Sequence, residues 1–396
     1  MADYVRIERC RGCHAPNELV TVLEMSPMPL AGLFCSSPKE AAVAPAFPLS
    51  WLRCVRCGLV QVGEDIDGQR LFGSYNYASS SVPGLVRHFD RYAESLGARF
   101  GSEERIDLLE IGCNDGVLLR RLPSSWRRVG VDPSDVAQRG RTPEDQYDLV
   151  VAPFGEALVE EHAWEDAFDV VTGSNCLAHI SDLRSVFVAV RRALRSGGWF
   201  WIEVHDLEAL LEGSQWDTIY HEHKVEWSVE SLQECLRPLG FELHVLERLP
   251  LHGGLIRCGF RKEVPVSNGP SPGSSTLDAP LARLADAYRK RLEMPSVQTL
   301  LRGQEKGELL AAYGASGRAN VFLNQIPELR FSFLVDEAPL RMNRFIPVVG
   351  TPIVPPTALA DRQPSRCLVT AWNYAKDIMG KNKHYSGEWL TAFPIR

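Results

Sequence analysis

The sequence lacks a long hydrophobic run: in its 396 residues, no apolar stretch reaches the roughly 18 that a membrane-spanning helix requires. The first residues, Met1–Arg6, also lack the cationic-then-apolar pattern of a secretory signal, so we expect a cytoplasmic protein. A positive charge excess is missing too, because the formal net charge is −7. This argues against nonspecific binding to nucleic acid or to an anionic membrane.

What is present is the composition of a soluble globular protein, with 45% apolar and 23% charged residues. A chain of this length exceeds one ordinary hydrophobic core, so we expect two or three domains. The ordered arrangement of motifs along the chain then indicates what each domain does.

Two glycines mark the stretch 107–120, in which a short apolar strand ends at Glu110 and the chain turns. A Val-Leu-Leu-x-x-Leu pattern follows and predicts a helix directly after Gly116. The spacing is Gly-x-x-x-Gly, so the Gly-x-Gly-x-x-Gly dinucleotide fingerprint is missing. Glycines here let the backbone approach a ligand, and the acidic and amide side chains around them suit a cation better than a pyrophosphate. S-adenosylmethionine, which has a sulfonium and an ammonium group, is such a ligand.

Strands and helices alternate through the central part of the chain, which predicts a parallel sheet covered on both faces. Asp132 ends the second strand, about 20 residues past the turn, where a carboxylate accepts from ribose hydroxyls. Two strands within 241–260 predict a closing antiparallel hairpin, which methyltransferase sheets have and dehydrogenase sheets lack. The expected donor-binding residues, placed at the ends of strands, are Glu110, Gly112, Asn114, Asp115, Gly116, Asp132 and Asn175.

Most of the ten cysteines stand singly, but four form two C-x-x-C pairs separated by 40 residues: Cys10, Cys13, Cys54 and Cys57. Two such pairs complete a tetrahedral zinc site. Four thiolate ligands leave no open coordination position, so we expect a structural zinc. His14 and Cys35 are spare ligands outside the pairs. A nucleic-acid-binding zinc ribbon is disfavoured, because the chain is acidic and has no basic face interleaved with aromatic residues.

The segment Tyr220-His221-Glu222-His223 concentrates titratable groups. Its His-x-His spacing suits a metal ion only if a third ligand converges, and an exposed charge cluster is a second interpretation. We favour acid–base chemistry. A carboxylate beside an imidazole stabilises the imidazolium and fixes its orientation, which suits a general base near neutral pH.

Two further stretches have both a structural and a ligand-binding interpretation. The polar aromatic segment 74–81 precedes a predicted helix at 83–100 and is either a turn or a source of hydroxyl groups for a polar ligand. The sequence His252-Gly253-Gly254 is either the bend of the hairpin or a loop that approaches the same ligand.

Residues 263–279 are rich in serine, glycine and proline and predict a linker. A long helical stretch at 280–306 follows and leads to a second α/β unit with a glycine turn after Tyr313. This unit resembles a dinucleotide-binding fold without its acidic residue. Arg318, next to the turn, suits the diphosphate of a nucleotide sugar.

Together these motifs resemble the nucleotide-sugar C-methyltransferases of deoxysugar biosynthesis over nearly the whole chain. The resemblance is carried by the two C-x-x-C pairs, Tyr75-x-Tyr77-x-Ser79-Ser80, Glu110-Ile-Gly-Cys-Asn-Asp-Gly116, Asn175-x-x-x-His179, Glu222-His223, His252-Gly253-Gly254, Tyr313-Gly-Ala315, Asp336 with Pro339, and Ala371-Trp372-Asn373. One departure follows Glu222-His223: the family continues with aromatic residues, whereas this chain has Lys224-Val-Glu226-Trp227.

The resemblance implies an α/β protein with a small four-cysteine zinc-binding domain at 1–72, a class I S-adenosylmethionine methyltransferase domain of Rossmann-like fold at 73–262, a linker at 263–279 and a Rossmann-like nucleotide-sugar-binding domain at 280–396. It further implies that His223 removes the proton next to the C4 ketone of a dTDP-4-keto-6-deoxysugar, so that carbon 3 is methylated. The implied catalytic residues are His223, Glu222, Tyr77, His179 and Tyr220. The implied substrate-binding residues are Tyr75, Ser79, Ser80, His252, Gly253, Tyr313, Arg318, Asn324, Trp372 and Asn373.

Three other functions compete with this interpretation. The nearest is S-adenosylmethionine-dependent O-methylation of a sugar or another small natural-product intermediate. An oxidoreductase with a nicotinamide cofactor is opposed by the missing glycine fingerprint. A non-catalytic zinc-ribbon scaffold leaves the histidine–glutamate cluster without a role. We expect a small-molecule substrate and a monomer or weak homo-oligomer.

Overall fold

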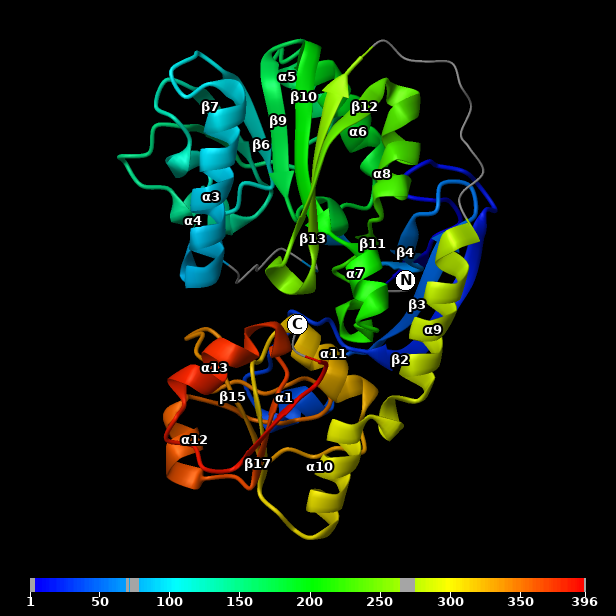
Figure 1. Ribbon diagram of the computed structural model, residues 1–396, viewed down its shortest axis with the longest axis vertical. Coiled ribbons are helices and arrows are strands. Elements are labelled where there is room, and N and C mark those ends of the chain that lie inside the picture. The colour runs from blue at the N-terminus through cyan, green and yellow to red at the C-terminus, as the bar shows by residue number, and fades with distance from the viewer. Residues whose placement is uncertain (1–3, 69–70, 72–77, 264–274, 395–396) are drawn as a thin grey trace.

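The computed structural model of the chain describes residues 4–68, 71, 78–263 and 275–394. An upper lobe contains a central sheet, a lower lobe contains the C-terminal sheet, and the N-terminal sheet lies along one side with α9 (Asp278–Arg289) (Figure 1). Among these described residues, no helix is long and apolar enough to cross a membrane.

The upper lobe is built on seven strands in the order β12-β13-β10-β9-β6-β7-β8. Five neighbouring strands are parallel, and β13 runs antiparallel to both of its neighbours, which confirms the predicted closing hairpin. Their bounds are β6 (Asp107–Ile111), β7 (Arg127–Val131), β8 (Asp148–Val150), β9 (Phe168–Ser174), β10 (Leu194–His205), β12 (Phe241–Leu249) and β13 (Leu255–Lys262).

Helices cover both faces of this sheet because successive strand residues point to opposite faces. On one face, α3 packs Phe89 and Tyr92 against Leu108 of β6. On the other face, α6 packs Phe187 against Phe200 of β10. The helices of this lobe are α3 (Pro83–Phe100), α4 (Asp135–Gly140), α5 (Glu156–Glu161), α6 (Leu183–Ala193), α7 (Leu207–Glu212) and α8 (Val229–Leu236).

The helix predicted directly after Gly116 does not form as an α-helix. The segment contains only a 3₁₀ turn, η2 (Leu119–Arg121), and Pro123 follows it closely. Proline has no N–H with which to continue a helix and it restricts the residue before it. The short stretch between Gly116 and Pro123 therefore closes as a tight turn.

The N-terminal sheet takes one of its four strands from far along the chain. Its order is β11-β4-β3-β2, in which β11 (Val225–Glu226) comes from the segment that follows His223. Val225 pairs with Gln61 and Glu226 with Val60 in an antiparallel ladder. The remaining elements of this region are β1 (Val5–Arg6), β2 (Leu19–Met28), α1 (Pro38–Ala42), β3 (Phe47–Cys54), β4 (Val60–Val62) and β5 (Glu64–Asp65).

The lower lobe contains a five-stranded parallel sheet in the order β16-β15-β14-β17-β18, which confirms the predicted second α/β unit. Its strands are β14 (Leu310–Tyr313), β15 (Phe333–Val335), β16 (Ile353–Val354), β17 (Arg366–Val369) and β18 (Glu388–Thr391). The predicted long helix at 280–306 is divided into α9 and α10 (Pro295–Glu305), since Pro295 begins a new helix. The other helices are α11 (Gly317–Gln325), α12 (Thr357–Arg362) and α13 (Ala375–Lys381).

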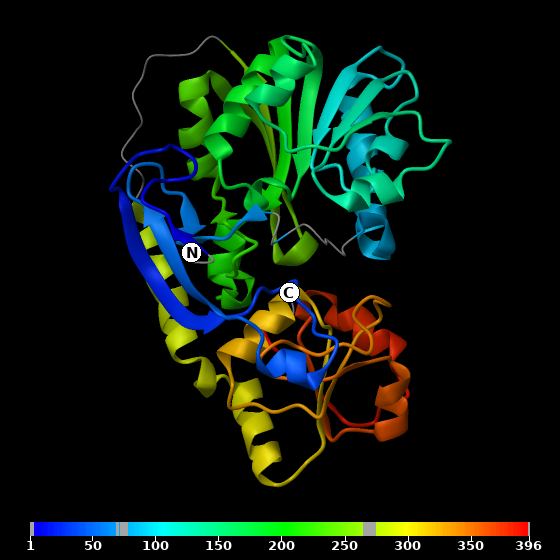
Figure 2. The same cartoon turned by 180° about the vertical axis from the view of Figure 1, so that it is seen from behind.

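One hydrophobic core joins all three parts of the chain. It includes Trp51 from β3, Trp216 from the segment after α7, and Phe322 from α11, whose ring stacks on Trp216 with centroids 5.4 Å apart. The helix α1 also lies against the lower lobe (Figure 2), where Val348 N–H donates to Ala41 O at 2.8 Å. The zinc-binding part therefore packs on both lobes, and the predicted boundaries along the sequence stay a prediction.

Candidate functional site

The loop after β6 holds two glycines in conformations that other residues rarely adopt. Gly112 has φ +67° and Gly116 has φ +75°. A Cβ atom on Gly112 would lie 2.5 Å from Cys176 Cβ, and one on Gly116 would lie 2.2 Å from Tyr147 Oη. Both glycines are thus required by backbone geometry and by close packing across the ends of the strands.

Acidic groups converge beneath this loop. Burial, and then the neighbouring Asp132 and Asp115 carboxylates, raise the pKa of Glu110 well above its ordinary value. Glu110 Oε2 and Asp115 Oδ1 are buried and have no hydrogen-bond partner among the described residues. Buried anionic oxygens without a partner are costly, and a cationic ligand would remove that cost. These carboxylate oxygens therefore fit the sulfonium and ammonium groups of S-adenosylmethionine.

Asp132 organises the loop from the end of β7. Its Oδ2 accepts from Asn114 N–H at 2.9 Å, and its Oδ1 accepts from Ser134 N–H at 2.8 Å. A carboxylate offers about four lone-pair positions, so Asp132 has acceptor capacity left for ribose hydroxyls. Asn175, at the end of β9, has φ +55° and a buried Oδ1 without a partner in the described chain.

Ser79 and Ser80 lie against the loop after β6, which is expected to bind the methyl donor. Ser79 N–H donates to Asn114 Oδ1 at 2.9 Å, and Ser80 N–H donates to Asp115 Oδ2 at 3.1 Å. The adjoining Tyr75 and Tyr77 lie outside the described residues, as does the side chain of His252. The contacts of Ser79 and Ser80 connect the polar aromatic segment to the donor side of the site.

The four C-x-x-C cysteines form one cluster. Cys10 Sγ lies 3.6 Å from Cys57 Sγ, and Cys13 Sγ lies 3.7 Å from Cys54 Sγ, with all four sulfurs within 4.8 Å of one another. Tetrahedral zinc with bonds of about 2.3 Å separates its sulfur ligands by about 3.8 Å. The cluster therefore fits a zinc ion. Cys35 lies elsewhere, and its backbone forms an isolated antiparallel β-bridge with Phe345.

His223 lies between a tyrosine and a carboxylate. Its Nε2 is 2.6 Å from Tyr220 Oη, and its Nδ1 is 3.5 Å from Glu226 Oε1. In its ionised form the Glu226 carboxylate accepts hydrogen bonds and does not donate them, so this form favours a proton on His223 Nδ1 and leaves the lone pair of Nε2 to accept from the tyrosine. Two further imidazoles flank His223, with ring centroids 5.4 Å away for His179 and 5.0 Å away for His205.

The expectation that Glu222 supports His223 is wrong for this structure. Glu222 Oε1 accepts from Gly32 N–H at 2.8 Å, and the carboxylate within ion-pair distance of His223 is Glu226. Residues 220–223 form a turn, in which His223 N–H donates to Tyr220 O at 3.0 Å, and this turn directs the Glu222 side chain away from the imidazole. His221 also points away, with Nε2 2.8 Å from Pro48 O.

His179, expected among the catalytic residues, directs one ring nitrogen to the protein backbone. Its Nδ1 lies 2.7 Å from Glu222 O. A carbonyl oxygen only accepts, so Nδ1 carries the proton and the neutral ring presents a lone pair at Nε2. Burial lowers the pKa of His179, which favours this neutral form.

Burial dominates the electrostatics around His223. It lowers the pKa of His223 well below the ordinary value, and the nearby His205 and His179 lower it further. Burial raises the pKa of Glu226 to about 8, against the opposing effect of Arg318. His223 is therefore neutral at physiological pH and Glu226 exchanges a proton in the same range.

Arg318 does not present an uncompensated charge to a diphosphate, which corrects the expectation for this residue. Its guanidinium binds Asp217 through two hydrogen bonds, of 2.7 and 3.1 Å, and lies 4.6 Å from the centre of the Trp372 ring. Trp372 Nε1–H donates to the same carboxylate at 3.0 Å. Because Asp217 is buried, it neutralises Arg318 within the interface of the two lobes.

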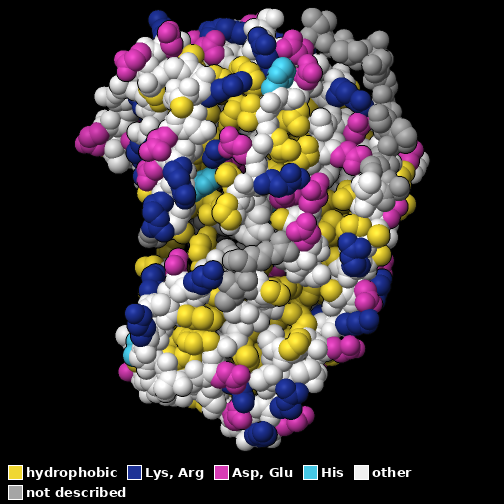
Figure 3. Space-filling view, viewed as in Figure 1, with side chains coloured by type: hydrophobic (Ala, Val, Ile, Leu, Met, Phe, Trp, Pro, Cys, Tyr) yellow, Lys and Arg dark blue, Asp and Glu magenta, His cyan; other side chains and the backbone are white. Residues whose placement is uncertain are grey.

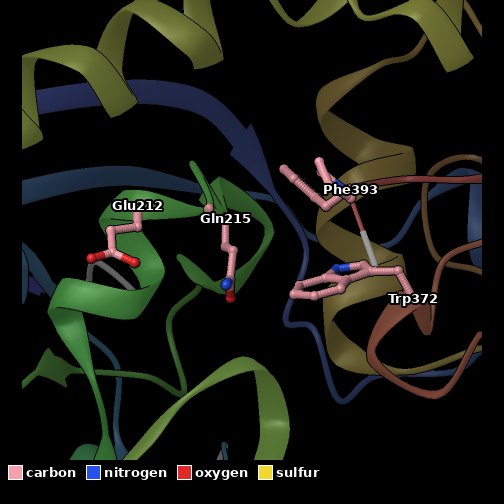
Figure 4. A pocket seen from close by; sticks show the side chains of 6 residues that line it. Glu212, Gln215, Trp372 and Phe393 are labelled. Atoms are coloured by element: carbon pink, nitrogen blue, oxygen red, sulfur yellow. The ribbon is translucent and has the colours of Figure 1, made fainter. Parts of the chain in front are cut away.

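Near this interface lies a cavity of about 100 Å³ (Figure 4). Gln215 and Trp372 face each other across it, and Gln215 Nε2–H donates to Gly253 O at 3.2 Å. The volume is below the range of about 300–1,000 Å³ that small-molecule sites occupy. The cavity holds part of a ligand at most in this arrangement of the lobes.

The other expected substrate residues have partners within the lower lobe. Tyr313 Oη donates to Glu337 Oε1 at 3.1 Å, and Asn324 Nδ2–H donates to Asn320 O at 2.9 Å. Asn373 lies beside Trp372 in the 3₁₀ turn η9 (Trp372–Tyr374). The structure thus brings Trp372 and Arg318 to Asp217 of the upper lobe, while Tyr313 and Asn324 bind their own domain.

Sequence reasoning missed three residues of the site: His205, Asp217 and Glu226. His205 ends β10, which is a position where α/β sheets place functional side chains. Glu226 lies in the stretch Lys224–Trp227, where this chain departs from the resembled family, and this departure was its only signal. Asp217 showed none, because its partner Arg318 is 101 residues away.

Comparisons with known proteins agree with this arrangement. Three family models match: “Putative zinc binding domain” at 10–72, “Methyltransferase domain” at 85–246 and “C-methyltransferase C-terminal domain” at 282–394. C-methyltransferase NovU of Streptomyces niveus is 28% identical over 412 aligned positions, which cover 100% of this chain and 97% of NovU. A ubiquinone biosynthesis O-methyltransferase of Cronobacter sakazakii is 33% identical over 113 residues, covering 27% of this chain and 43% of that protein. Among solved structures, the PH0226 protein of Pyrococcus horikoshii OT3 has 20% identity and a TM-score of 0.38, covering 49% of this chain and 98% of that one.

The strand order, the antiparallel β13 and the matched methyltransferase model define a class I S-adenosylmethionine-dependent methyltransferase. Within that class, the three models in this order give the chain the domain set of a C-methyltransferase, similar to NovU over its full length.

Proposed function

We propose that the protein transfers a methyl group to the carbon next to the ketone of a dTDP-4-keto-6-deoxysugar, at carbon 3. The substrate class rests on the resemblance described from the sequence. The observation that carries the chemistry is the buried His223, with a lone pair at Nε2 directed toward Tyr220 and a carboxylate behind Nδ1. A base held in this way is suited to removing a proton from carbon.

The donor side of the proposed site consists of Glu110, Asp115, Asp132 and Asn175 at the ends of the strands. When bound there, S-adenosylmethionine supplies an electrophilic methyl group and leaves as the neutral thioether. Glu110 and Asp115 offer buried acceptor atoms to its cationic groups, and Asp132 keeps acceptor capacity for its ribose. Gly112 and Gly116 keep the backbone close to the strand ends.

Proton removal is assigned to His223. Its Nε2 takes the proton from the carbon that the adjacent ketone acidifies, and the electron pair of the broken C–H bond stays on the substrate as an enolate. Glu226 stabilises the imidazolium that forms, in the role first expected of Glu222. General-base assistance of this kind contributes about 10²–10⁴-fold in rate.

The enolate oxygen requires a hydrogen-bond donor. Tyr220 is the described donor closest to His223, and Tyr77 shares the role by resemblance. His179 holds its proton toward Glu222 O, so we assign it to orienting the segment that contains His223 instead. The new C–C bond would form to the methyl group that S-adenosylmethionine supplies when the residues at the strand ends hold it.

We place the nucleotide part of the substrate between the lobes. A hollow separates the upper and lower lobes on the side opposite the N-terminal sheet (Figure 3). Trp372 and Gly253 are in reach of each other near this junction, since a Cβ on Gly253 would lie 3.1 Å from the Trp372 ring. Trp372 offers an aromatic face, although Arg318 already covers part of it.

The test is a substrate screen. The protein is incubated with S-adenosylmethionine and a panel of dTDP-linked keto-deoxysugars, and the products are read by mass spectrometry and NMR. We expect one methyl group on a carbon next to the ketone. A methyl group on a sugar oxygen would instead establish the O-methyltransferase alternative, and no product with any keto sugar would refute the substrate class.

A further inference from the structure

Three potential metal ligands from two segments converge beside the proposed base. His205 ends β10, and His223 and Glu226 come from the segment that enters β11. One ligand atom from each residue lies within 4.8 Å of the other two. Glu226 Oε2 is 3.9 Å from His205 Nδ1, and Glu226 Oε1 is 3.5 Å from His223 Nδ1. These three residues are called the His205 triad below.

The carboxylate of the triad is buried without hydrogen bonds. Glu226 has an exposed fraction of 1%, and neither of its oxygens has a hydrogen-bond partner in the described part of the chain. The Nδ1 atom of His223 is also buried and lacks such a partner. An anionic group in this position is expensive unless a cation compensates it.

The nearest side-chain cations are engaged elsewhere. Arg318 binds Asp217. Lys224 lies next to His223 in sequence, but its ammonium group binds Asp65, Ile66 O and Ser181 Oγ. The chain therefore offers Glu226 no direct salt bridge from lysine or arginine in the described structure.

We propose that the His205 triad binds one divalent transition-metal ion, separate from the four-cysteine site. Two imidazoles and one carboxylate form a donor set that zinc, cobalt(II) and iron(II) all accept. Ligand atoms on bonds of about 2.0–2.1 Å are about 3.4 Å apart in a tetrahedral site. The triad reaches that spacing by a small inward movement of its three side chains.

Binding of the ion has a consequence for the base, and this consequence rests on the proposed function. A metal ion on His223 Nδ1 leaves the neutral ring with its proton on Nε2, so the lone pair that would accept the substrate proton is lost. The ion also takes Glu226 away from the imidazole. The metal-bound enzyme is therefore inactive, and the triad acts as an inhibitory metal site that shares one residue with the catalytic machinery.

Cobalt(II) titration tests the site directly. The protein is prepared with one zinc per chain in the four-cysteine site, confirmed by elemental analysis, and Co²⁺ is added without removing that zinc. We expect one additional ion per chain, with visible d–d bands and without the intense thiolate-to-cobalt charge-transfer band that a cysteine site would give. His205→Phe, which keeps a ring but removes the ligand atom, and Glu226→Gln should each weaken Co²⁺ binding by at least about 100-fold.

A matched control is provided by another histidine–glutamate pair. His244 lies 3.8 Å from Glu242 on β12, where both side chains are exposed. His244→Phe should leave the second ion in place. Absence of a second ion from the wild-type protein would overturn the proposal, as would undiminished Co²⁺ binding in both triad variants when circular dichroism shows that they are folded.

Measuring turnover with and without Zn²⁺ distinguishes a failure of the proposed metal site from a failure of the proposed function. Zn²⁺ at concentrations that fill the triad should lower turnover of the wild-type enzyme at least tenfold, whereas turnover of His205→Phe, measured against its own rate without added metal, should resist the ion. If Co²⁺ binds as expected but filling the triad leaves turnover unchanged, the inhibitory role is refuted and His223 is not the base. If turnover is inhibited equally in His205→Phe, the inhibiting ion binds elsewhere.

Discussion

The backbone of Glu226 pairs with that of Val60 across the β11–β4 ladder. Val60 begins the strand β4, which follows the C-x-x-C pair of Cys54 and Cys57. On the same ladder, Val62 N–H donates to Lys224 O at 2.9 Å. The segment that presents His223 to the site is therefore held in position by the four-cysteine region, although the two are separated by about 160 residues in sequence.

Opening the cysteine cluster should therefore disturb the proposed active site before it disturbs the donor site. For Cys54→Ser we expect loss of zinc, lower solubility and loss of turnover. Hydrogen–deuterium exchange should show faster exchange in residues 220–227 while β6 and β9 keep their protection.

Cys35→Ser is the matched control, since Cys35 lies outside the cluster, where its backbone forms an isolated β-bridge with Phe345. It should keep one zinc and wild-type exchange at 220–227. Full activity in a zinc-free preparation would remove the structural role assigned to the metal.

Replacement of the proposed base should separate binding from chemistry. His223→Asn is expected to lower kcat by about 10²–10⁴-fold while the Kd for S-adenosylmethionine, measured by calorimetry, changes less than threefold. The donor site is formed by other strand ends, so its affinity should be preserved. A variant with wild-type kcat would show that His223 is not the base.

Glu110→Gln should weaken donor binding and stabilise the free protein. A hydrogen bond to a charged group contributes about 1.5–3 kcal/mol, so we expect the Kd for S-adenosylmethionine to rise by roughly tenfold or more. Glu104→Gln, at an exposed position before the same strand, should leave the Kd unchanged.

The same glutamate predicts a pH dependence of stability. Its pKa is raised in the folded protein, chiefly by burial. The stability that Glu110 contributes is therefore complete below the carboxyl pKa of the unfolded chain, about 4.3. It is lost as the pH rises through the higher pKa that Glu110 has in the folded protein. The Tm of the ligand-free wild-type protein should fall more steeply with rising pH than that of Glu110→Gln. Parallel Tm profiles would contradict the assignment.

The Arg318–Asp217 pair should behave as a buried ion pair. Arg318→Met alone leaves a buried aspartate without its cation and should cost about 3–5 kcal/mol of unfolding free energy. The double variant with Asp217→Leu should recover most of that loss. Denaturant unfolding measures both, and a cost below about 1 kcal/mol for the single variant would show that the pair is solvated.

Features encoded locally were predictable from the sequence. Apolar runs that end at glycine turns gave the strands β6 and β14, and the C-x-x-C spacing gave the four-cysteine cluster. The helix 83–100 was predicted with its observed bounds, because Pro83 begins it and its apolar residues recur at helical spacing.

Long-range contacts were not predictable in the same way. The two-residue strand β11 has no periodicity of its own, so nothing near Glu226 indicated its pairing with Val60. Sequence proximity suggested Glu222 as the partner of His223, but only the three-dimensional path of the chain shows that Glu226 is nearer. The partner of Arg318 is likewise remote in sequence.

The most direct test is hydrogen exchange at the substrate carbon. A dTDP-4-keto-6-deoxysugar is incubated with the enzyme in deuterated buffer without S-adenosylmethionine, and the C3 proton is followed by NMR. If a protein imidazole forms the enolate, the wild-type enzyme should introduce deuterium at C3 while His223→Asn does not exceed the buffer rate. A wild-type enzyme that methylates the sugar yet introduces no deuterium, or an equal rate in the variant, would contradict that assignment.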